Sequence, residues 1–340
     1  MGTEEIPVIS VIIPAYNEEK RIANAIEGIL KQNYPKEKME VIVVDDCSKD
    51  NTLYVASKYS IKTICHDKNK GDSASRNTGA KHAFGDLIAT TDADDKVDEN
   101  WLINISKHYN DSNLGAVLGS SHIIYNYNNW QQRIISELSI CLRGSDAVDA
   151  IHDLNGKVGS NNSIGSNQAF KKELFLKIGG YDTRLAAGMD QEIVWRIEQA
   201  GYNIIFEPNA IVYITLRESF KKYIKNIYLR ARGGILVYFM YKDKLTFRYI
   251  LNLGYVPLII FTVTAYKLFN ISLFATIFTS ILVLPYFYFI LRIIKGRRYV
   301  QNILDIPLIL VLGSVSLIVS SIGMLSGCLN YILNYKKFKN

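Results

Sequence analysis

Three carboxylates fall within four consecutive positions of the segment TTDADD at residues 90–95, with aspartates at 92, 94 and 95. Carboxylate oxygens are ligands that hard divalent cations such as Mg²⁺ prefer, and a cation held by them can neutralise a phosphate. Turns also favour Asp, so the segment alone does not distinguish a metal site from a solvated turn. The surrounding elements have to decide between the two.

Buried strands alternate with helices along the first part of the chain. Continuous apolar, β-branched runs predict strands at residues 8–14, 40–46, 61–66 and 86–92, with helices between them. The first of these helices has its apolar residues on one face, and Asn17 is in position to cap it. This alternation predicts an α/β fold with a mostly parallel sheet covered by helices.

Polar residues follow three of these strands, at Pro14–Glu18, Asp45–Asp46 and Asp92–Asp95. The carboxyl ends of parallel strands lie at one edge of a sheet, and ligands of such sheets bind at that edge. The three clusters are therefore expected to converge on one site. A solvated turn explains any one of them but accounts less well for all three.

Five ordered motifs resemble those of the family 2 glycosyltransferases: VIIPAYNEE, VVDDCSKDNT, GDSASRNTG, TTDADD and GMDQEIVWR. The resemblance covers roughly Pro7 to Arg217, and the ordered set is specific where no single motif would be. It implies a GT-A fold, in which one nucleotide-binding α/β domain uses a nucleotide-sugar donor and a divalent cation, Mg²⁺ or Mn²⁺. It also implies that the sugar is transferred with inversion.

The resemblance also implies a metal site. Asp94 is expected to bind the cation directly, and Asp92 to help through the ribose or a water molecule. Strand pleating would turn both side chains to one side and Ala93 away from them. Asp95 is expected to be only a turn acid.

Donor-binding residues follow from the same resemblance. They are expected to be Pro14, Tyr16, Glu18, Asp46, Arg76 and Asp92. The first two and Asp46 correspond to the nucleotide-base pocket, and Glu18 to a position near the ribose. Arg76 corresponds to a basic residue near the donor phosphates, where its planar guanidinium suits two oxygens. The alternative for Arg76 is a surface ion pair.

Asp190 is the expected catalytic base, because an acceptor hydroxyl must lose a proton as it attacks the anomeric carbon. It matches the aspartate of the family's Glu-Asp motif, although Met189 stands in place of the Glu. The alternative role of Asp190 is to cap a helix. Thr215 stands where the family often has a His near the metal, so only Asp94 and Asp92 are expected as metal ligands.

The C-terminal part differs sharply from the rest in charge and hydropathy. Residues 1–217 carry 23 Lys and Arg against 29 Asp and Glu, whereas residues 218–340 carry 16 against 3. Three long uncharged runs, at residues 250–266, 271–291 and 306–335, predict transmembrane helices at residues 250–269, 271–293 and 306–329. The expected organisation is a glycosyltransferase domain at 1–217, a basic amphipathic interfacial segment at 218–248 and a transmembrane region at 249–335.

Positive charge predicts the orientation of this region. The basic stretches at Lys221–Arg232 and Lys295–Arg298 flank the expected spans and should be cytoplasmic, which places the catalytic domain on the cytoplasmic side of a multi-pass membrane protein. The basic C-terminus, KKFKN, would then lie outside after three crossings. Either the third segment is re-entrant or the charge rule is overridden there.

The leading functional hypothesis is transfer of a sugar to a hydroxyl of a lipid-linked saccharide or glycolipid. One alternative is a polyprenyl-phosphate monosaccharide synthase, whose phosphate acceptor needs little base catalysis. A second is a catalytically silent protein that binds nucleotide-sugars. A processive polysaccharide synthase is less favoured. Processive members of the family usually carry a Q-x-x-R-W segment, and the segment NIYLRARGG of this chain has no Trp. The expected partners are the donor, a lipid-linked or glycan acceptor and membrane lipid, with no nucleic acid; an oligomer is possible.

Overall fold

The computed structural model describes residues 6–124, 128–143, 165–216, 218–241, 259–264 and 302–335, with single positions at 257, 268, 291 and 338. The chain divides into two compact units. The first comprises Met1–Ile124 and Val148–Thr215, and the second comprises Tyr125–Ala147 and Leu216–Asn340. The sequence did not predict that residues 125–147 group with the C-terminal part.

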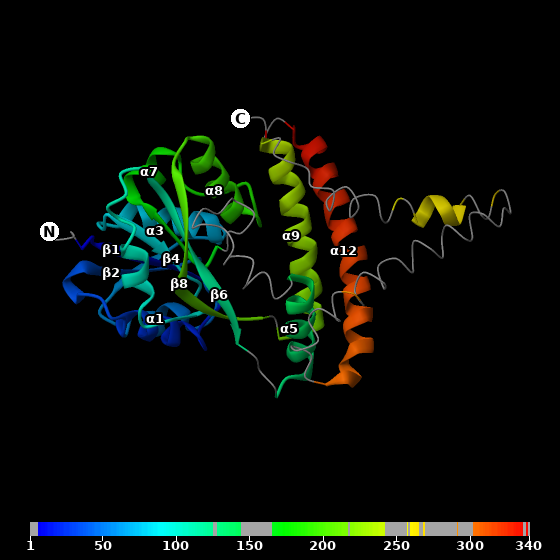
Figure 1. Ribbon diagram of the computed structural model, residues 1–340, viewed down its shortest axis with the longest axis horizontal. Coiled ribbons are helices and arrows are strands. Elements are labelled where there is room, and N and C mark those ends of the chain that lie inside the picture. The colour runs from blue at the N-terminus through cyan, green and yellow to red at the C-terminus, as the bar shows by residue number, and fades with distance from the viewer. Residues whose placement is uncertain are drawn as a thin grey trace. The chain divides into compact units, whose positions relative to one another are not determined.

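A sheet of eight strands forms the centre of the first unit (Figure 1). Its order is β3-β2-β1-β4-β7-β6-β8-β5. The strands are β1 (Ile9–Ala15), β2 (Met39–Asp45), β3 (Lys62–Cys65), β4 (Leu87–Thr90), β5 (Lys96–Val97), β6 (Leu114–Ile124), β7 (Gln168–Lys171) and β8 (Asn203–Thr215). Strands β1 to β4 are mutually parallel, as predicted, and so are β6 and β8. Strand β7 runs antiparallel to both β4 and β6, and β5 antiparallel to β8, so the sheet is mixed.

Helices cover both faces of this sheet. The helices are α1 (Ile22–Leu30), α2 (Thr52–Ala56), α3 (Asp72–His82), α4 (Trp101–Ser106), α7 (Lys172–Lys177) and α8 (Met189–Gln199), with a short 3₁₀ turn at Lys36–Lys38. The pleat of β1 sends Ile9, Val11 and Ile13 into one core with α1 and α4, and Ile12 into a second core with α3, α7 and α8. In Figure 1, α7 and α8 accordingly lie across the sheet from α1.

Helix α3 sits close against β1 because Gly79 has no side chain. A Cβ built at Gly79 would lie 2.5 Å from Cγ2 of Ile12, a distance that real Cβ atoms essentially never show. Arg76 is on the same helix, three residues earlier. The close packing of α3 on β1 therefore helps to fix the position of Arg76.

Two local predictions at these strand ends were wrong: the capping role of Asn17 and the strand conformation of the residues around Asp92. Helix α1 begins at Ile22, and Asn17 does not cap it; the side chain of Asn17 instead accepts a hydrogen bond from Lys49 N at 2.8 Å. Strand β4 ends at Thr90, so residues 91–95 form a turn, in which Asp95 N donates to Asp92 O at 3.2 Å. Ala93 is buried as expected, but a turn rather than a strand pleat separates Asp92 from Asp94.

The described residues of the second unit form three long helices, α5 (Trp130–Arg143), α9 (Phe220–Tyr241) and α12 (Ile306–Leu333), and a 3₁₀ turn at Ile303–Asp305. Gly323 and Gly327 of α12 face α9 directly. A Cβ at Gly323 would lie 2.6 Å from Tyr228 O, and one at Gly327 would lie 2.7 Å from Arg232 O. The later glycine of α12 contacts the later residue of α9, so the two helices run parallel, and they are in close contact.

A charged pair joins α5 to the start of α12. Arg133 Nε and Nη2 donate to the two oxygens of Asp305 at 3.0 and 3.2 Å, and the Asp305 side chain is only 8% exposed. Ile134, Ile135 and Leu138 of α5 pack with Tyr223 of α9 and with Ile309 and Leu312 of α12. The three helices therefore share one apolar core.

Helix α12 is long and apolar enough to cross a membrane by its length and composition. It has 28 residues and a mean hydropathy of 2.4 over its most apolar window. Its outward positions are apolar along its length, among them Val311, Ile318, Leu329 and Ile332. The expected spans at 250–269 and 271–293 lie almost entirely outside the described residues. Within the described part of the chain, α12 is the one candidate span.

Candidate active site

Arg76 lies buried between two carboxylates at the carboxyl edge of the sheet. Its side chain is 1% exposed; Nε donates to Asp72 Oδ1 at 3.1 Å, and Nη2 donates to Asp92 Oδ1. Burial disfavours the charged guanidinium, but the carboxylates of Asp72 and Asp92 outweigh this effect and raise the pKa of Arg76, so it stays charged. Among the described residues, Nη1 of Arg76 has no hydrogen-bond partner.

A second arginine lies beside Asp94. Arg21 makes two hydrogen bonds to Glu18, at 2.7 and 2.9 Å, and its Nη1 lies 3.3 Å from Asp94 Oδ2. Glu18 follows β1 and Asp94 follows β4, and these strands are neighbours in the sheet. Arg21 therefore joins the residue expected near the ribose to the residue expected to bind the metal.

Asp95 is a turn residue, but its carboxyl group is not solvated. The residue is 7% exposed, and its Oδ2 has no hydrogen-bond partner among the described residues. Burial, reinforced by the negative charges of Asp92 and Asp94, raises the pKa of the Asp95 carboxyl to about 9. At neutral pH the Asp95 carboxyl is therefore held toward its protonated, neutral form.

Asp46 holds the loop that leads into α3. Its Oδ1 accepts from Lys70 N at 2.8 Å and its Oδ2 from Gly71 N at 2.7 Å, while Nδ1 of His66 lies 2.7 Å from Oδ1. Gly71 has a φ of +90°, a conformation that favours glycine. Asp46 is 4% exposed, and both of its carboxylate oxygens accept hydrogen bonds from this loop.

The loops after β1 and β2 are tied to each other. Asn17 and Cys47, one in each loop, have positive φ angles of 57° and 64°. Asn17 N donates to Ser48 Oγ at 2.9 Å, and Asp45 Oδ2 accepts from Ser48 N at 3.1 Å. Non-glycine residues seldom adopt this conformation, and such residues gather at functional sites.

Asp190 lies in the first turn of α8, and its side chain contacts Gly165, just before the start of β7. Its Oδ2 accepts a hydrogen bond from Gly165 N at 3.1 Å, and its backbone oxygen accepts from Gln168 Nε2 at 3.1 Å. Thr90 Oγ1, at the end of β4, donates to Gly165 O at 3.0 Å. Gly165 therefore connects Asp190 to the strand that carries the acidic turn.

The remaining expected donor residues lie around these groups. Pro14 is in β1 and half-buried, and the Tyr16 side chain after it is 45% exposed. Nearby, the start of α3 and the loop before α8 enclose a hollow of about 230 Å³. Lys70, Gly71, Asp72, Ser73, Arg184 and Met189 are among the residues that line it. The site thus combines an exposed aromatic ring, cationic side chains and an acidic turn.

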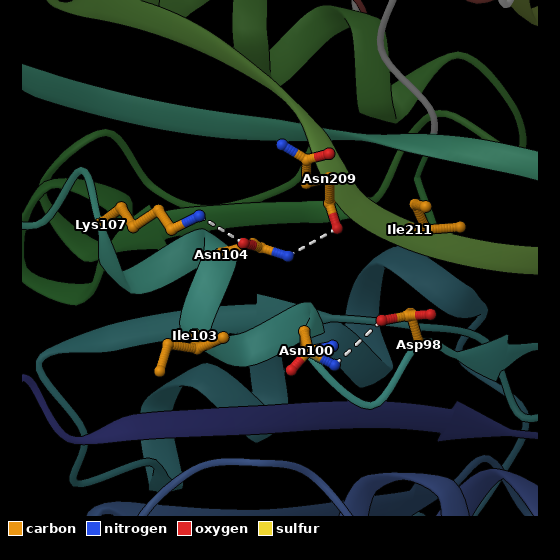
Figure 2. A pocket seen from close by; sticks show the side chains of 7 residues that line it. All are labelled: Asp98, Asn100, Ile103, Asn104, Lys107, Asn209 and Ile211. Carbon is orange, nitrogen blue, oxygen red and sulfur yellow. Dashed lines mark hydrogen bonds between the residues drawn. The ribbon is translucent and has the colours of Figure 1, made fainter.

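A larger hollow of about 380 Å³ lies away from this site (Figure 2). It lies between α4 and β8, where Asn104 Nδ2 donates to Asn209 O at 2.7 Å and Lys107 donates to Asn104 Oδ1. Asp98, at its rim, accepts through its backbone oxygen from Gln32, just beyond the C-terminal end of α1. None of the residues that line this hollow is among those expected to bind the donor, the metal or the acceptor.

By themselves, the residues of the acidic turn provide only some of the ligands that a divalent cation needs. Among the residues that the structure describes, no group of three or more His, Cys, Asp or Glu side chains could hold a metal ion. Asp92 and Asp94 offer oxygen atoms, which suit Mg²⁺ or Mn²⁺ when further ligands come from phosphate or water. This donor set fits a cation that binds together with a diphosphate.

Comparison with protein families gives a direct match. Residues 10–179, half of the chain, match the family described as glycosyl transferase family 2. The chain belongs to this family. The first four motifs quoted above lie within the matched region, and the motif around Asp190 lies beyond it.

Curated relatives of this family 2 chain come from bacteria and archaea. It is 30% identical over 240 residues to the probable glycosyltransferase YdaM of Bacillus subtilis, covering 68% of this chain and 56% of that protein. It is 26% identical over 263 residues to the glycosyltransferase AglE of Haloferax volcanii, covering 74% and 80%. It is 28% identical to the poly-β-1,6-N-acetyl-D-glucosamine synthase of Staphylococcus aureus, covering 69% and 56%. The chain thus spans just over half the length of two of these relatives.

Solved structures share the fold. The mannosyltransferase PcManGT of Pyrobaculum calidifontis, in complex with GDP-Man and Mn²⁺, aligns with a TM-score of 0.60 at 20% identity, over 94% of this chain and 88% of that one. GalNAc-T7, with UDP, GalNAc and Mn²⁺, aligns with a TM-score of 0.55 at 16% identity, over 74% and 51%. These similarities confirm the predicted α/β fold of the GT-A type.

Several residues of this family 2 site carried no prediction. Asp72 lies four residues before Arg76 on α3, a spacing that favours an ion pair on a helix and could have indicated this contact. Glu18 and Arg21 pair in the turn before α1, where helical spacing does not apply. His66 gave no such signal. Its contact with Asp46 depends on the pairing of β2 with β3, which sequence spacing does not reveal.

Proposed function

We propose that this chain is a membrane-bound, inverting glycosyltransferase. It would move a sugar from a nucleotide-sugar donor to a hydroxyl of a lipid-linked saccharide or glycolipid, at the cytoplasmic face of a membrane. The observation that carries the proposal is the convergence of Arg76, the acidic turn at Asp92–Asp95 and Asp190 at one edge of the sheet. The family membership supports the same reaction class.

The donor residues would act by position and charge. The exposed ring of Tyr16 can stack on a nucleotide base. Arg76 orients Asp92, because a buried guanidinium between two carboxylates keeps both in place. Asp46 shapes the pocket by holding the Lys70–Gly71 loop, so its contribution to donor binding is in large part indirect.

Asp190 would accept the proton of the acceptor hydroxyl. The hydroxyl oxygen forms a bond to the anomeric carbon while the bond from that carbon to the diphosphate oxygen breaks, and the nucleoside diphosphate leaves. A single displacement inverts the anomeric carbon. The hydrogen bond from Gly165 N holds the Asp190 carboxylate in place, and a general base has to be held within reach of the proton that it accepts.

Asp94 and Asp92 would hold Mg²⁺ or Mn²⁺. When bound, such a cation neutralises the negative charge that develops on the leaving diphosphate. The chain's own cations, Arg21 and Arg76, lie beside the two carboxylates and limit their mutual repulsion.

Membrane attachment would come from the C-terminal part, as a multi-pass region that includes α12 and the expected spans at 250–269 and 271–293. The apolar length of α12 supports it. Helix α9 packs parallel to α12, so where α12 crosses a bilayer α9 would follow its direction rather than lie flat on the surface. The basic residues of α9 support a cytoplasmic position for its N-terminal end.

Binding of UDP, GDP and CDP to the full chain in detergent, with and without Mn²⁺, tests the donor site. We expect one of these nucleotides to raise the melting temperature, and Mn²⁺ to increase the shift. Transfer from the matching labelled nucleotide-sugar is then measured with lipid extracts as acceptor. If no nucleoside diphosphate stabilises the chain, the donor site is wrong.

The two alternative functions give different results in the same assay. A polyprenyl-phosphate monosaccharide synthase would use polyprenyl phosphate as acceptor and would keep most activity in an Asp190→Asn variant. A silent binding protein would bind the nucleotide but transfer no sugar to any lipid fraction. Asp190, held at the site by Gly165, favours a hydroxyl acceptor over both.

A further inference from the structure

Each of the two aspartates expected at the metal is held by a different arginine, and the two arginines differ in freedom. Arg76, which holds Asp92, is 1% exposed and fixed within the protein. Arg21, which contacts Asp94, is 38% exposed. A partly exposed arginine can leave a carboxylate at little cost, because water screens the pair.

The contacts of Arg21 are also unequal. It donates two hydrogen bonds to Glu18, at 2.7 and 2.9 Å, whereas its Nη1 lies 3.3 Å from Asp94 Oδ2. A fork of two short, parallel hydrogen bonds is stronger than a longer contact. Arg21 can therefore release Asp94 and remain attached to Glu18 at the margin of the site.

We propose that Arg21 is the resident counter-ion of Asp94 in the empty enzyme and competes with the divalent cation for that carboxylate. This inference rests on the proposed metal site at Asp94. A cation that arrives alone must displace Arg21. When the cation arrives with a diphosphate, Arg21 can contact the phosphate oxygens in place of Asp94, because its hydrogen bonds to Glu18 keep it at the site. Arg21 is thus a positioning residue that favours binding of the cation and the nucleotide together.

Removal of the Arg21 charge should increase the affinity for Mn²⁺. Loss of a contact with only a structural role would not have this effect. Arg21→Gln should increase the affinity for Mn²⁺ alone by about 3- to 10-fold, because a positive charge next to Asp94 is removed. The factor by which a nucleoside diphosphate increases Mn²⁺ affinity should fall in the same variant. Arg21→Lys keeps the charge and should stay within about 2-fold of the wild type for Mn²⁺ alone.

The test is a titration of full-length chain in detergent with Mn²⁺, in which the electron paramagnetic resonance signal of free Mn²⁺ is followed without nucleotide and with UDP or GDP. Lys20→Gln is the matched control, because it removes one charge from the exposed neighbouring residue. It should leave Mn²⁺ affinity unchanged. If Arg21→Gln does not fold, Arg21→Met keeps the aliphatic part of the side chain and has the same expected result.

An Asp94→Asn variant separates failure of this inference from failure of the metal site. If Asp94→Asn abolishes Mn²⁺ binding while Arg21→Gln leaves it unchanged or weakens it, the role of Arg21 is wrong and the metal site stands. If Asp94→Asn binds Mn²⁺ as the wild type does, the metal assignment itself is wrong, and the role of Arg21 falls with it.

Discussion

Oδ2 of Asp190 lies 3.1 Å from the backbone nitrogen of Gly165, which is 25 positions earlier in the chain. Gly165 also accepts a hydrogen bond from Thr90, the last residue of β4. One backbone unit thus links the expected catalytic base to the strand that ends in the acidic turn. This link holds Asp190 at a fixed position relative to the end of β4.

Asp190→Asn should lower the rate of transfer by about 10²- to 10⁴-fold, because the amide cannot accept the proton of the acceptor hydroxyl. Nucleotide affinity should change little, since the amide oxygen can still accept from Gly165 N. Labelled-sugar transfer and nucleotide titration measure the two effects. Glu198→Gln, an equal change of charge at an exposed position of α8, is the control. Unchanged transfer in Asp190→Asn would remove Asp190 from the role of base.

Asp46→Asn should destabilise the protein by about 1–3 kcal/mol, because an amide nitrogen replaces one of the oxygens that accept from Lys70 N and Gly71 N. Nucleotide affinity should fall together with the melting temperature, as the loop before α3 loosens. Asp67→Asn, in the same region but with a side chain 75% exposed, should do neither. Weaker nucleotide binding at an unchanged melting temperature would instead indicate that Asp46 contacts the base directly.

Gly327→Ala should destabilise the packing of α9 on α12 by about 1–3 kcal/mol, because the new Cβ would lie 2.3 Å from Ile235 Cγ2 and 2.7 Å from Arg232 O. Thermal unfolding of the full chain in detergent measures the effect. Gly28→Ala is the control with the opposite sign. Its Cβ would meet only Val97 Cγ2 at 3.7 Å, so alanine in the interior of α1 should stabilise by about 0.5–1 kcal/mol. Equal shifts in both variants would contradict the close helix contact.

The contribution of Glu207 to the stability of the folded protein should depend on pH. Burial raises the pKa of its carboxyl, but hydrogen bonds from His108 at 2.9 Å and from Asn209 N at 3.0 Å outweigh burial and lower it. A lowered pKa in the folded state adds stability above the unfolded pKa, and this stability is lost as the pH falls through the folded value. Glu207→Gln should therefore cost about 1 kcal/mol at pH 7.

The difference between wild type and Glu207→Gln should shrink below about pH 4.5, where the carboxyl of the unfolded chain begins to bind its proton. Denaturant unfolding at a series of pH values measures it. Glu173→Gln, at an exposed position of α7, provides the comparison. A difference that stays constant from pH 7 to pH 3 would show that the hydrogen bonds do not favour the ionised form of Glu207.

The elements of the first unit could be predicted because their signals are local. Strands β1 and β2 are continuous runs of β-branched residues, and Ile22, Ile26 and Ile29 repeat at helical spacing and are buried. Parallel strands then bring Asp46 and Asp92 to one edge without further information. The insertion of β7 between β4 and β6 was missed, since four residues that follow the stretch at 144–164 carry no sign of their pairing.

The partners of the charged groups were decided by the tertiary structure. By itself the sequence determined the local strands, helices and ordered motifs, and from these and the family resemblance it predicted that Asp92, Asp94, Arg76 and Asp190 belong to one site. Whether Asp94 meets Arg21, whether Asp46 holds a loop, and whether α9 lies against α12 depend on contacts between segments distant in the chain. Such contacts follow from how whole elements pack, because side-chain distance is set by the distance and angle between backbones and not by sequence separation.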